Sequence, residues 1–212
     1  MEDDKNAATE SSTRACERID PILAHLKIEG LDVDIEKIRS RFDELWEYEK
    51  ADSLDSLEEY YTTLALFIYT CHVVLDDYNL NTIRAREPIS RAITNWLSPE
   101  IEKQVAEEKA TENPFKTFVE KNQSRVDEFY TWEYFLLETK KAGEKEWNFK
   151  LKKCWFSQFY IRFGRPDFIQ TACTYCQVPA EARKDYVNLK LTNTFAKLGT
   201  FCQFKYTPHK DS

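Results

Sequence analysis

Four of the six cysteines in this 212-residue chain lie in its last third, at Cys154, Cys173, Cys176 and Cys202. A lone free cysteine is usually a small apolar core residue. A group of cysteines beside aromatic and polar side chains can instead supply a thiolate, which attacks the carbon of an amidine or amide. We therefore look for a functional site in this part of the chain.

Cys154 and Cys173 are the leading candidates for a catalytic nucleophile, with Cys176 beside them. Cys154 is expected where a strand passes into a helix and follows Lys152 and Lys153, so helix amides and positive charge would lower its pKa. Cys173 is expected at or near a helix end, where the helix dipole disfavours a thiolate. On electrostatic grounds Cys154 is the better placed of the two.

Other side chains of the same region could move protons or line a pocket. The candidates for proton transfer are Glu133, Tyr134, Asp167, Tyr175, Cys176 and Asp185. The expected lining of a pocket for a small organic molecule consists of Trp132, Tyr134, Trp155, Tyr175 and Cys202. Sequence alone does not rank the proton-transfer candidates.

The cysteines also allow other interpretations. Cys154, Cys173, Cys176 and Cys202 could form a four-thiolate zinc site, but such sites usually contain two Cys-x-x-Cys pairs and only Cys173-Thr-Tyr-Cys176 is present. That pair could instead be redox-active, or all four could be buried thiols. We predict no metal and no cofactor.

The three histidines are not arranged in a pattern typical of a catalytic or metal site. His25, His72 and His209 are not paired at i and i+4, which disfavours a histidine metal site or a Ser-His-Asp triad. His25 and His72 are expected at partly exposed positions on helices. No Gly-rich phosphate loop and no Gly-x-Ser-x-Gly elbow occurs.

The amino-acid composition limits the kinds of binding partner that can be expected. With 37 acidic and 30 basic residues the net charge is −7, and no basic stripe appears, so nucleic acid is excluded as an expected partner. No apolar run reaches the roughly 20 residues of a membrane helix, and the acidic start lacks signal-peptide features. We expect a cytoplasmic protein with reduced thiols and a small-molecule substrate, and homo-oligomerisation stays open.

The elements that position these residues are predicted to form one α+β domain over residues 15–212, after a flexible tail over residues 1–14. An N-terminal helical bundle would pack on a small C-terminal antiparallel sheet with two short helices. Helix starts are expected at Asp32 or Asp34, at Ser53 or Ser56, at Ser98-Pro99 and at Asn113-Pro114.

The last third is expected to hold the sheet. Its elements would be a hairpin over 130–139 and 147–151, helices from 154 to 163 and after Pro166, and strands near 186–195 and 200–206. Gly164 would end the first of these helices.

Two segments carry a family resemblance: Cys154 through the Gly164-Arg-Pro166 turn to Cys173, and residues 194–206 with Gly199-Thr-Phe-Cys202. In these segments the chain resembles the L-2-amino-thiazoline-4-carboxylic acid hydrolase family. That family's pattern is a cysteine that closes a strand, a helix leading to a Gly-x-Pro-like turn, a second cysteine, and a last strand that begins with Gly-x-x-Cys. The resemblance covers about residues 130–206 and favours Cys173 as the reactive thiol.

The resemblance implies a cytoplasmic enzyme that opens or hydrolyses a small ring with a C–N bond, in specialised metabolism. The family usually has an acidic residue three positions after the second cysteine, where this chain has Cys176. If that carboxylate positions water, this chain must perform the step differently. A cyclase or isomerase on the same scaffold is therefore a second hypothesis, and a non-catalytic small-ligand or zinc-binding protein is a third.

Overall fold

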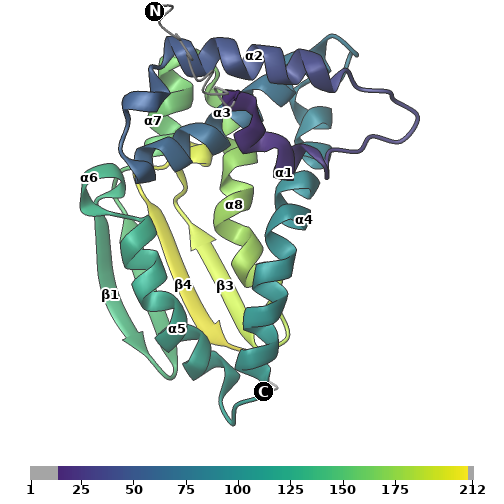
Figure 1. Ribbon diagram of the computed structural model, residues 1–212. Helices are drawn as coiled ribbons and strands as arrows, with labels where there is room; N and C mark the ends of the chain where they lie inside the picture. Colours follow the sequence, from purple (N-terminus) through teal and green to yellow (C-terminus); the bar gives the residue numbers. More distant parts are fainter. Residues whose placement is uncertain (1–13, 210–212) are drawn as a thin grey trace, which may run out of the picture.

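The computed structural model describes residues 14–209, and in it helices cover one face and one end of a four-stranded sheet (Figure 1). The predicted tail falls outside this range except for Arg14, whose guanidinium donates to Asp43. The α+β fold class is confirmed. None of the helices between residues 14 and 209 has the length and apolarity that a membrane crossing requires.

The N-terminal helices form a layer at one end of the sheet. They are η1 (Ala15–Ile19), α1 (Asp20–Leu23), α2 (Ile35–Tyr48), η2 (Ala51–Ser53) and α3 (Ser56–Asp76). Asp34, one of the two residues predicted to begin this helix, is the N-cap of α2. Asp55 caps α3 in place of Ser53 or Ser56, because its carboxylate accepts the N–H groups of Leu57 and Glu58.

The long helix α4 (Thr82–Lys109) runs through Ser98-Pro99, so the helix start predicted there is wrong. Ile93 and Ile101, on either side of Pro99, are both buried, and their packing keeps the helix continuous despite the missing N–H. The Ser98 hydroxyl donates to the Thr94 carbonyl within the same helix instead of capping a new one.

The predicted start at Asn113 is confirmed, because its side chain accepts the Lys116 N–H at the beginning of α5 (Pro114–Phe129). Residues 130–136, which were expected in a strand, instead form the short helix α6 (Trp132–Phe135) and a turn at Leu136, whose φ is 48°. The ring of Phe135 is buried against Tyr61 of α3, and this contact favours the helical turn over an extended strand.

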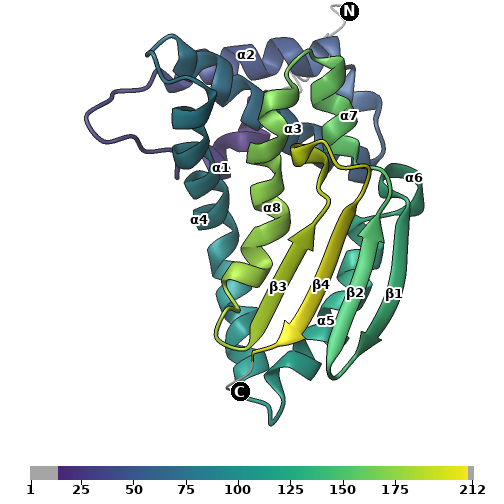
Figure 2. The ribbon, with the colours of Figure 1, turned by 180° about the vertical axis from the view of Figure 1, so that it is seen from behind.

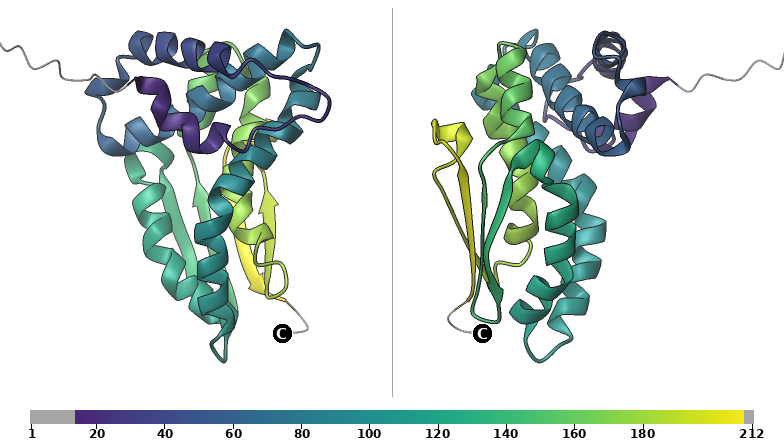
Figure 3. Two further views of the ribbon diagram at one scale, coloured as in Figure 1. Left: turned by 45° about the vertical axis from the view of Figure 1, so that its right-hand side comes forward. Right: turned by 90° about the vertical axis from the view of Figure 1, so that its left-hand side faces the viewer.

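The sheet is antiparallel throughout, with the strand order β1-β2-β4-β3. Its strands are β1 (Leu137–Gly143), β2 (Glu146–Leu151), β3 (Val187–Thr192) and β4 (Cys202–Pro208). Alternate residues of β2 and β4 are buried, so one face of the sheet lies against the helices, while no helix within residues 14–209 covers the other face (Figures 2 and 3).

Between β2 and β3 lie α7 (Trp155–Arg162), η3 (Pro166–Phe168) and α8 (Ile169–Glu181), and η4 (Phe195–Lys197) precedes β4. As predicted, Gly164 stops α7: it follows the C-cap residue Phe163 and has a φ of 68°, which glycine adopts without steric cost. Helix α8 then runs along the covered face of the sheet beside α4 (Figure 1). This arrangement brings residues of α8 opposite the rings of β2 and β4.

Candidate functional site

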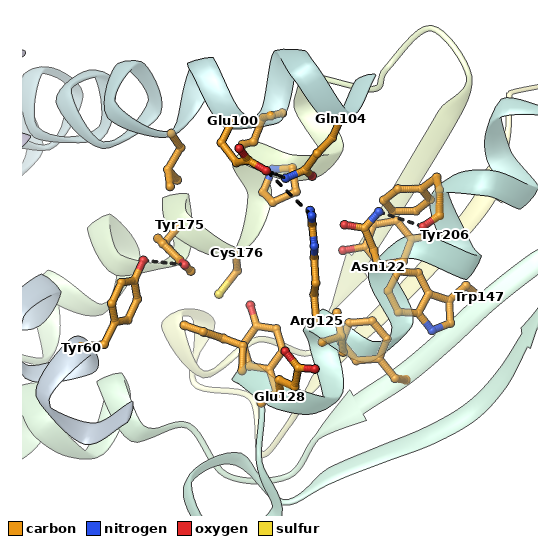
Figure 4. Close-up of a pocket in the computed structure, with 18 of the residues that line it drawn as sticks. Tyr60, Glu100, Gln104, Asn122, Arg125, Glu128, Trp147, Tyr175, Cys176 and Tyr206 are labelled. Atoms are coloured by element: carbon orange, nitrogen blue, oxygen red, sulfur yellow. Dashed lines mark hydrogen bonds and ion pairs between the residues drawn. The ribbon is translucent and has the colours of Figure 1, made fainter. Parts of the chain in front are cut away.

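A cavity of about 610 Å³ lies between α4, α5, α8 and the covered face of the sheet (Figure 4). Its floor is formed by the buried rings of Phe118, Tyr130, Trp147, Phe149 and Tyr206. Exposed charged side chains, Glu100, Arg125 and Glu128, lie at its mouth. The cavity thus has an aromatic floor and a charged rim.

Strand register positions the floor rings that belong to the sheet, Trp147, Phe149 and Tyr206. Trp147 of β2 pairs with Tyr206 of β4, and Phe149 pairs with Phe204, so all four rings fall on the same face of the sheet. The Trp147 and Tyr206 rings stack with their centroids 5.2 Å apart. The floor rings of the two strands thus pack against one another.

Cys176 on α8 lines this cavity, and its thiol points into the space between Tyr175 and Arg125 (Figure 4). The Tyr130 hydroxyl lies close enough to the Cys176 sulfur to act on its pKa. Burial raises the pKa of Cys176 to about 12, and the Tyr130 hydroxyl offsets part of that increase. At neutral pH Cys176 is therefore a protonated thiol with a tyrosine hydroxyl beside it.

A pair of tyrosines lies next to this thiol. The hydroxyl oxygens of Tyr60 on α3 and Tyr175 on α8 are 2.9 Å apart and share a hydrogen bond. Burial raises the pKa of both, so both hydroxyls stay protonated and can donate or accept. Together with Tyr130 they supply the polar groups near Cys176.

The other three cysteines of the group lie close enough to interact electrostatically, but they do not line this cavity. Cys154 is the N-cap residue of α7, as expected, yet its pKa is raised and not lowered. Burial outweighs the helix amides, and the two lysines before it are engaged elsewhere: Lys152 with Glu138, and Lys153 with the Glu133 carbonyl. The predicted activation of Cys154 by these groups is wrong.

Cys173 lies inside α8 and not at a helix end, and burial raises its pKa and that of Cys202. Within residues 14–209 no three His, Cys, Asp or Glu side chains are arranged to hold a metal ion. The four-thiolate zinc interpretation therefore gains no support from the geometry of the described residues.

Of the expected aromatic lining, Tyr175 faces the cavity and Trp132, Tyr134 and Trp155 lie outside it. Trp132 is 65% exposed. The other two gather at the N-terminus of α3, where the Tyr134 hydroxyl donates to Asp55 over 2.8 Å and Trp155 Nε1 donates to Glu58 over 3.3 Å. The carboxylates there hold these rings in place.

The remaining proton-transfer candidates are engaged away from the cavity. Asp167 pairs with Arg165, which lowers the pKa of its carboxyl, and Asp185 pairs with Lys109 with the same effect. Glu133 does not line the cavity either. Of the six candidates, Tyr175 and Cys176 alone belong to its wall.

His72 is buried, with 2% of its surface exposed, so the prediction of a partly exposed position is wrong. Its Nε2 lies 2.7 Å from the Thr171 hydroxyl and its ring stacks on Phe168. Burial lowers the pKa of His72 to about 3 and keeps the ring neutral. His25 follows α1 and is half-buried.

Sequence reasoning missed the buried ion pair behind the cavity. Arg183 and Glu108 are fully buried, and Arg183 Nε donates to Glu108 Oε2 over 2.7 Å. The guanidinium also donates to Gln104, whose amide donates to Glu100 at the mouth over 2.9 Å. Arg125, 3.8 Å from Glu100, completes this polar path. The two members of the buried pair are far apart in sequence, so no local pattern could indicate it.

The raised pKa of Cys176 predicts slow alkylation. Since iodoacetamide reacts with the thiolate, the rate at Cys176 is expected to rise about tenfold per pH unit up to pH ~12, and at pH 8 to be roughly 100- to 1,000-fold below that of glutathione. Peptide mass spectrometry of timed samples measures this rate. A midpoint below pH 8.5 would show that the site stabilises the thiolate.

Comparison with known protein families shows that most of the cavity wall lies in a segment that matches a family model. The family model described as L-2-amino-thiazoline-4-carboxylic acid hydrolase matches residues 79–206, more than half of the chain. The matched segment holds α4, α5, α8 and the sheet, and thus most of the cavity wall. No match was found among curated proteins or among solved structures.

Proposed function

Because the chain belongs to the L-2-amino-thiazoline-4-carboxylic acid hydrolase family, we propose that it is a hydrolase-like enzyme acting on a ring C–N bond in the cavity around Cys176. The observation that carries this proposal is the position of Cys176. It stands where the family usually has an acidic residue, and its thiol faces a cavity large enough for a small organic molecule. Cys154 and Cys173, the other catalytic candidates, lie outside that wall.

The chemistry can begin from a neutral thiol. A cyclic amidine is basic, so as Sγ of Cys176 bonds to the amidine carbon, the C=N electron pair moves to nitrogen and that nitrogen takes the thiol proton. No resting thiolate is needed, which agrees with the raised pKa of Cys176. The Tyr130 hydroxyl beside the sulfur stabilises negative charge that develops there.

The tetrahedral adduct then opens the ring. The ring C–N bond breaks, and its electron pair goes to the leaving nitrogen, which takes a proton. At the same time the other nitrogen forms a C=N bond to the carbon and releases a proton. Water next bonds to the carbon, the C=N electron pair moves to nitrogen, and that nitrogen takes one water proton. The C=O bond then forms as the sulfur leaves with the C–S electron pair and takes the second water proton. The products are an amine and a carbonyl group, and the Cys176 thiol is regenerated.

A second function is favoured by the composition of the wall. Within residues 14–209 the groups that interact with Cys176 are tyrosines and thiols, whereas the wall carboxylates Glu100 and Glu128 are exposed at the mouth. No carboxylate is thus placed to activate water beside the sulfur. A cyclase or isomerase, in which Cys176 and Tyr130 move protons without adding water, fits the same site.

The product mass separates these reactions. Purified protein is incubated with L-2-amino-thiazoline-4-carboxylic acid and with a panel of cyclic amidines, and products are read by mass spectrometry. Hydrolysis adds the mass of one water and takes oxygen from ¹⁸O-labelled water, whereas isomerisation leaves the mass unchanged. Intact protein mass reports any adduct on Cys176. Turnover that survives Cys176→Ala would contradict both proposals.

A further inference from the structure

We propose that the molecule bound in this cavity is a hydrophobic, ring-containing compound of roughly twenty non-hydrogen atoms, neutral or cationic, with one polar end placed at Cys176. This inference rests on the proposed function, because it names the substrate class of the same site. The compound would be about twice the size of the amino acid in the family's name.

Volume gives the first argument. The cavity holds about 610 Å³. At about 30 Å³ per water molecule, this is the space of roughly twenty molecules of liquid water. It also falls within the range of about 300–1,000 Å³ that encloses drug-sized ligands. A compound as small as an amino acid would leave about half of the space unfilled and would lose contact with the opposite wall.

The chemistry of the wall gives the second argument. Eight aromatic residues line the cavity: Tyr60, Phe118, Phe129, Tyr130, Trp147, Phe149, Tyr175 and Tyr206. Aromatic faces and edges bind flat rings favourably, in stacked or edge-to-face contacts. A compact zwitterion on this floor would lose hydration without finding a charged partner, since the charged side chains of the wall lie at its mouth.

The thiol and the paired tyrosine hydroxyls lie together, which orients the molecule, while the amides of Gln104 and Asn122 belong to the wall near Tyr206 (Figure 4). Tyr60, Tyr175 and Cys176 lie on one side of the cavity, and Trp147 and Tyr206 lie on the other (Figure 4). An amide or amidine would therefore meet the hydroxyl and thiol groups, while the apolar body extends over the Trp147 and Tyr206 rings. This orientation puts the C–N bond at the sulfur.

Charge at the mouth argues against an anionic compound. Arg125 is paired with Glu100, and Glu128 adds a second negative charge to the rim. The net charge of the charged wall residues is thus negative. An entering anion would be repelled, whereas a neutral or cationic ring system would not.

The polar end of the cavity is completed by residues outside the family match. Ser56, Leu57 and Tyr60 of α3 belong to the wall but precede residue 79, where the matched segment begins. The Tyr60 hydroxyl shares a hydrogen bond with the hydroxyl of Tyr175, the residue that precedes Cys176 on α8. The shape of this end is therefore set by a part of the chain that the family pattern does not specify.

Calorimetric binding of two probes tests the inference. The large probe is 2-phenylquinazolin-4-one, a flat neutral ring system, and the small one is L-2-amino-thiazoline-4-carboxylic acid. The large probe is expected to bind at least tenfold more tightly. Leu97→Trp, which adds bulk to the wall on α4, is expected to weaken the large probe at least tenfold and the small probe less than threefold.

Ile83→Trp is the matched control, because Ile83 lies on the same helix and is 74% exposed. Val126→Phe, from the α5 side of the wall, is a second constricting variant, and circular dichroism verifies the folding of all three. Tighter binding of the small probe, no binding of the large one, or equal effects of Leu97→Trp and Ile83→Trp would overturn the inference.

Failure of this inference and failure of the proposed function give different results. Binding is measured without turnover and can be repeated in Cys176→Ala. If the size preference fails, turnover that depends on Cys176 still stands. If no reaction depends on Cys176, the preference for large rings is still measured.

Discussion

Replacing Cys176 with alanine is expected to lower kcat by at least about 100-fold, because the variant lacks the sulfur that, in the proposed reaction, forms and breaks the bond to the substrate carbon. KM should change less than kcat, since the aromatic floor that binds the apolar body is unaltered. The measurement is steady-state turnover of whichever cyclic amidine the wild-type protein converts. Loss of the covalent adduct in intact mass spectra should accompany the loss of rate.

Cys173→Ala is the matched control for this prediction. Cys173 lies on the same helix and has a raised pKa, but it does not line the cavity, so turnover should stay within about threefold of wild type. If Cys173→Ala loses activity and Cys176→Ala keeps it, the reactive thiol has been assigned to the wrong cysteine. Cys154→Ala extends the comparison to the third candidate.

Cys176→Asp distinguishes the two proposed reactions further. It introduces an acidic side chain at the position where the family resemblance implies one. A carboxylate there can accept a proton from water, so addition of water should persist or appear in this variant while the thiol adduct is lost. A variant that forms neither product shows that the thiol and the carboxylate are not interchangeable on this scaffold.

Replacing Glu108 with glutamine is expected to destabilise the protein by about 3–5 kcal/mol, because it leaves the fully buried Arg183 guanidinium without a charged partner. The neighbouring groups supply no replacement charge, since the Tyr186 hydroxyl donates to the Glu108 carboxylate, and the Gln104 side chain and the Pro179 carbonyl offer Arg183 only neutral oxygens. Urea denaturation followed by circular dichroism measures the loss as a lower midpoint at similar slope.

The double variant Glu108→Gln with Arg183→Met provides the control. It removes both charges, so the loss should be smaller than the sum of the two single effects. Glu107→Gln tests a neighbouring carboxylate: Glu107 pairs with Lys121 at the surface, where solvent screens an ion pair, so this substitution should change the stability little. Equal destabilisation by Glu107→Gln and Glu108→Gln would contradict the role given to the buried pair.

The sequence alone determined the features that depend on neighbouring residues. The caps at Asp34 and Asn113 and the stop at Gly164 were predictable, since each is settled within one turn of chain. Strands over 147–151 and near 200–206 were predicted and are found as β2 and β4, and the motifs around Cys154, Cys173 and Cys202 indicated the family that matches residues 79–206.

Tertiary structure decided what depends on distant contacts. It kept α4 continuous through Pro99, because burial on both sides outweighs a missing hydrogen bond, and it buried His72 against Phe168. It brought Tyr60 to Tyr175 and Glu108 to Arg183. It also selected Cys176 among four similar cysteines, since whether a thiol faces a cavity, and how far its pKa moves, depends on surroundings that no spacing in the sequence records.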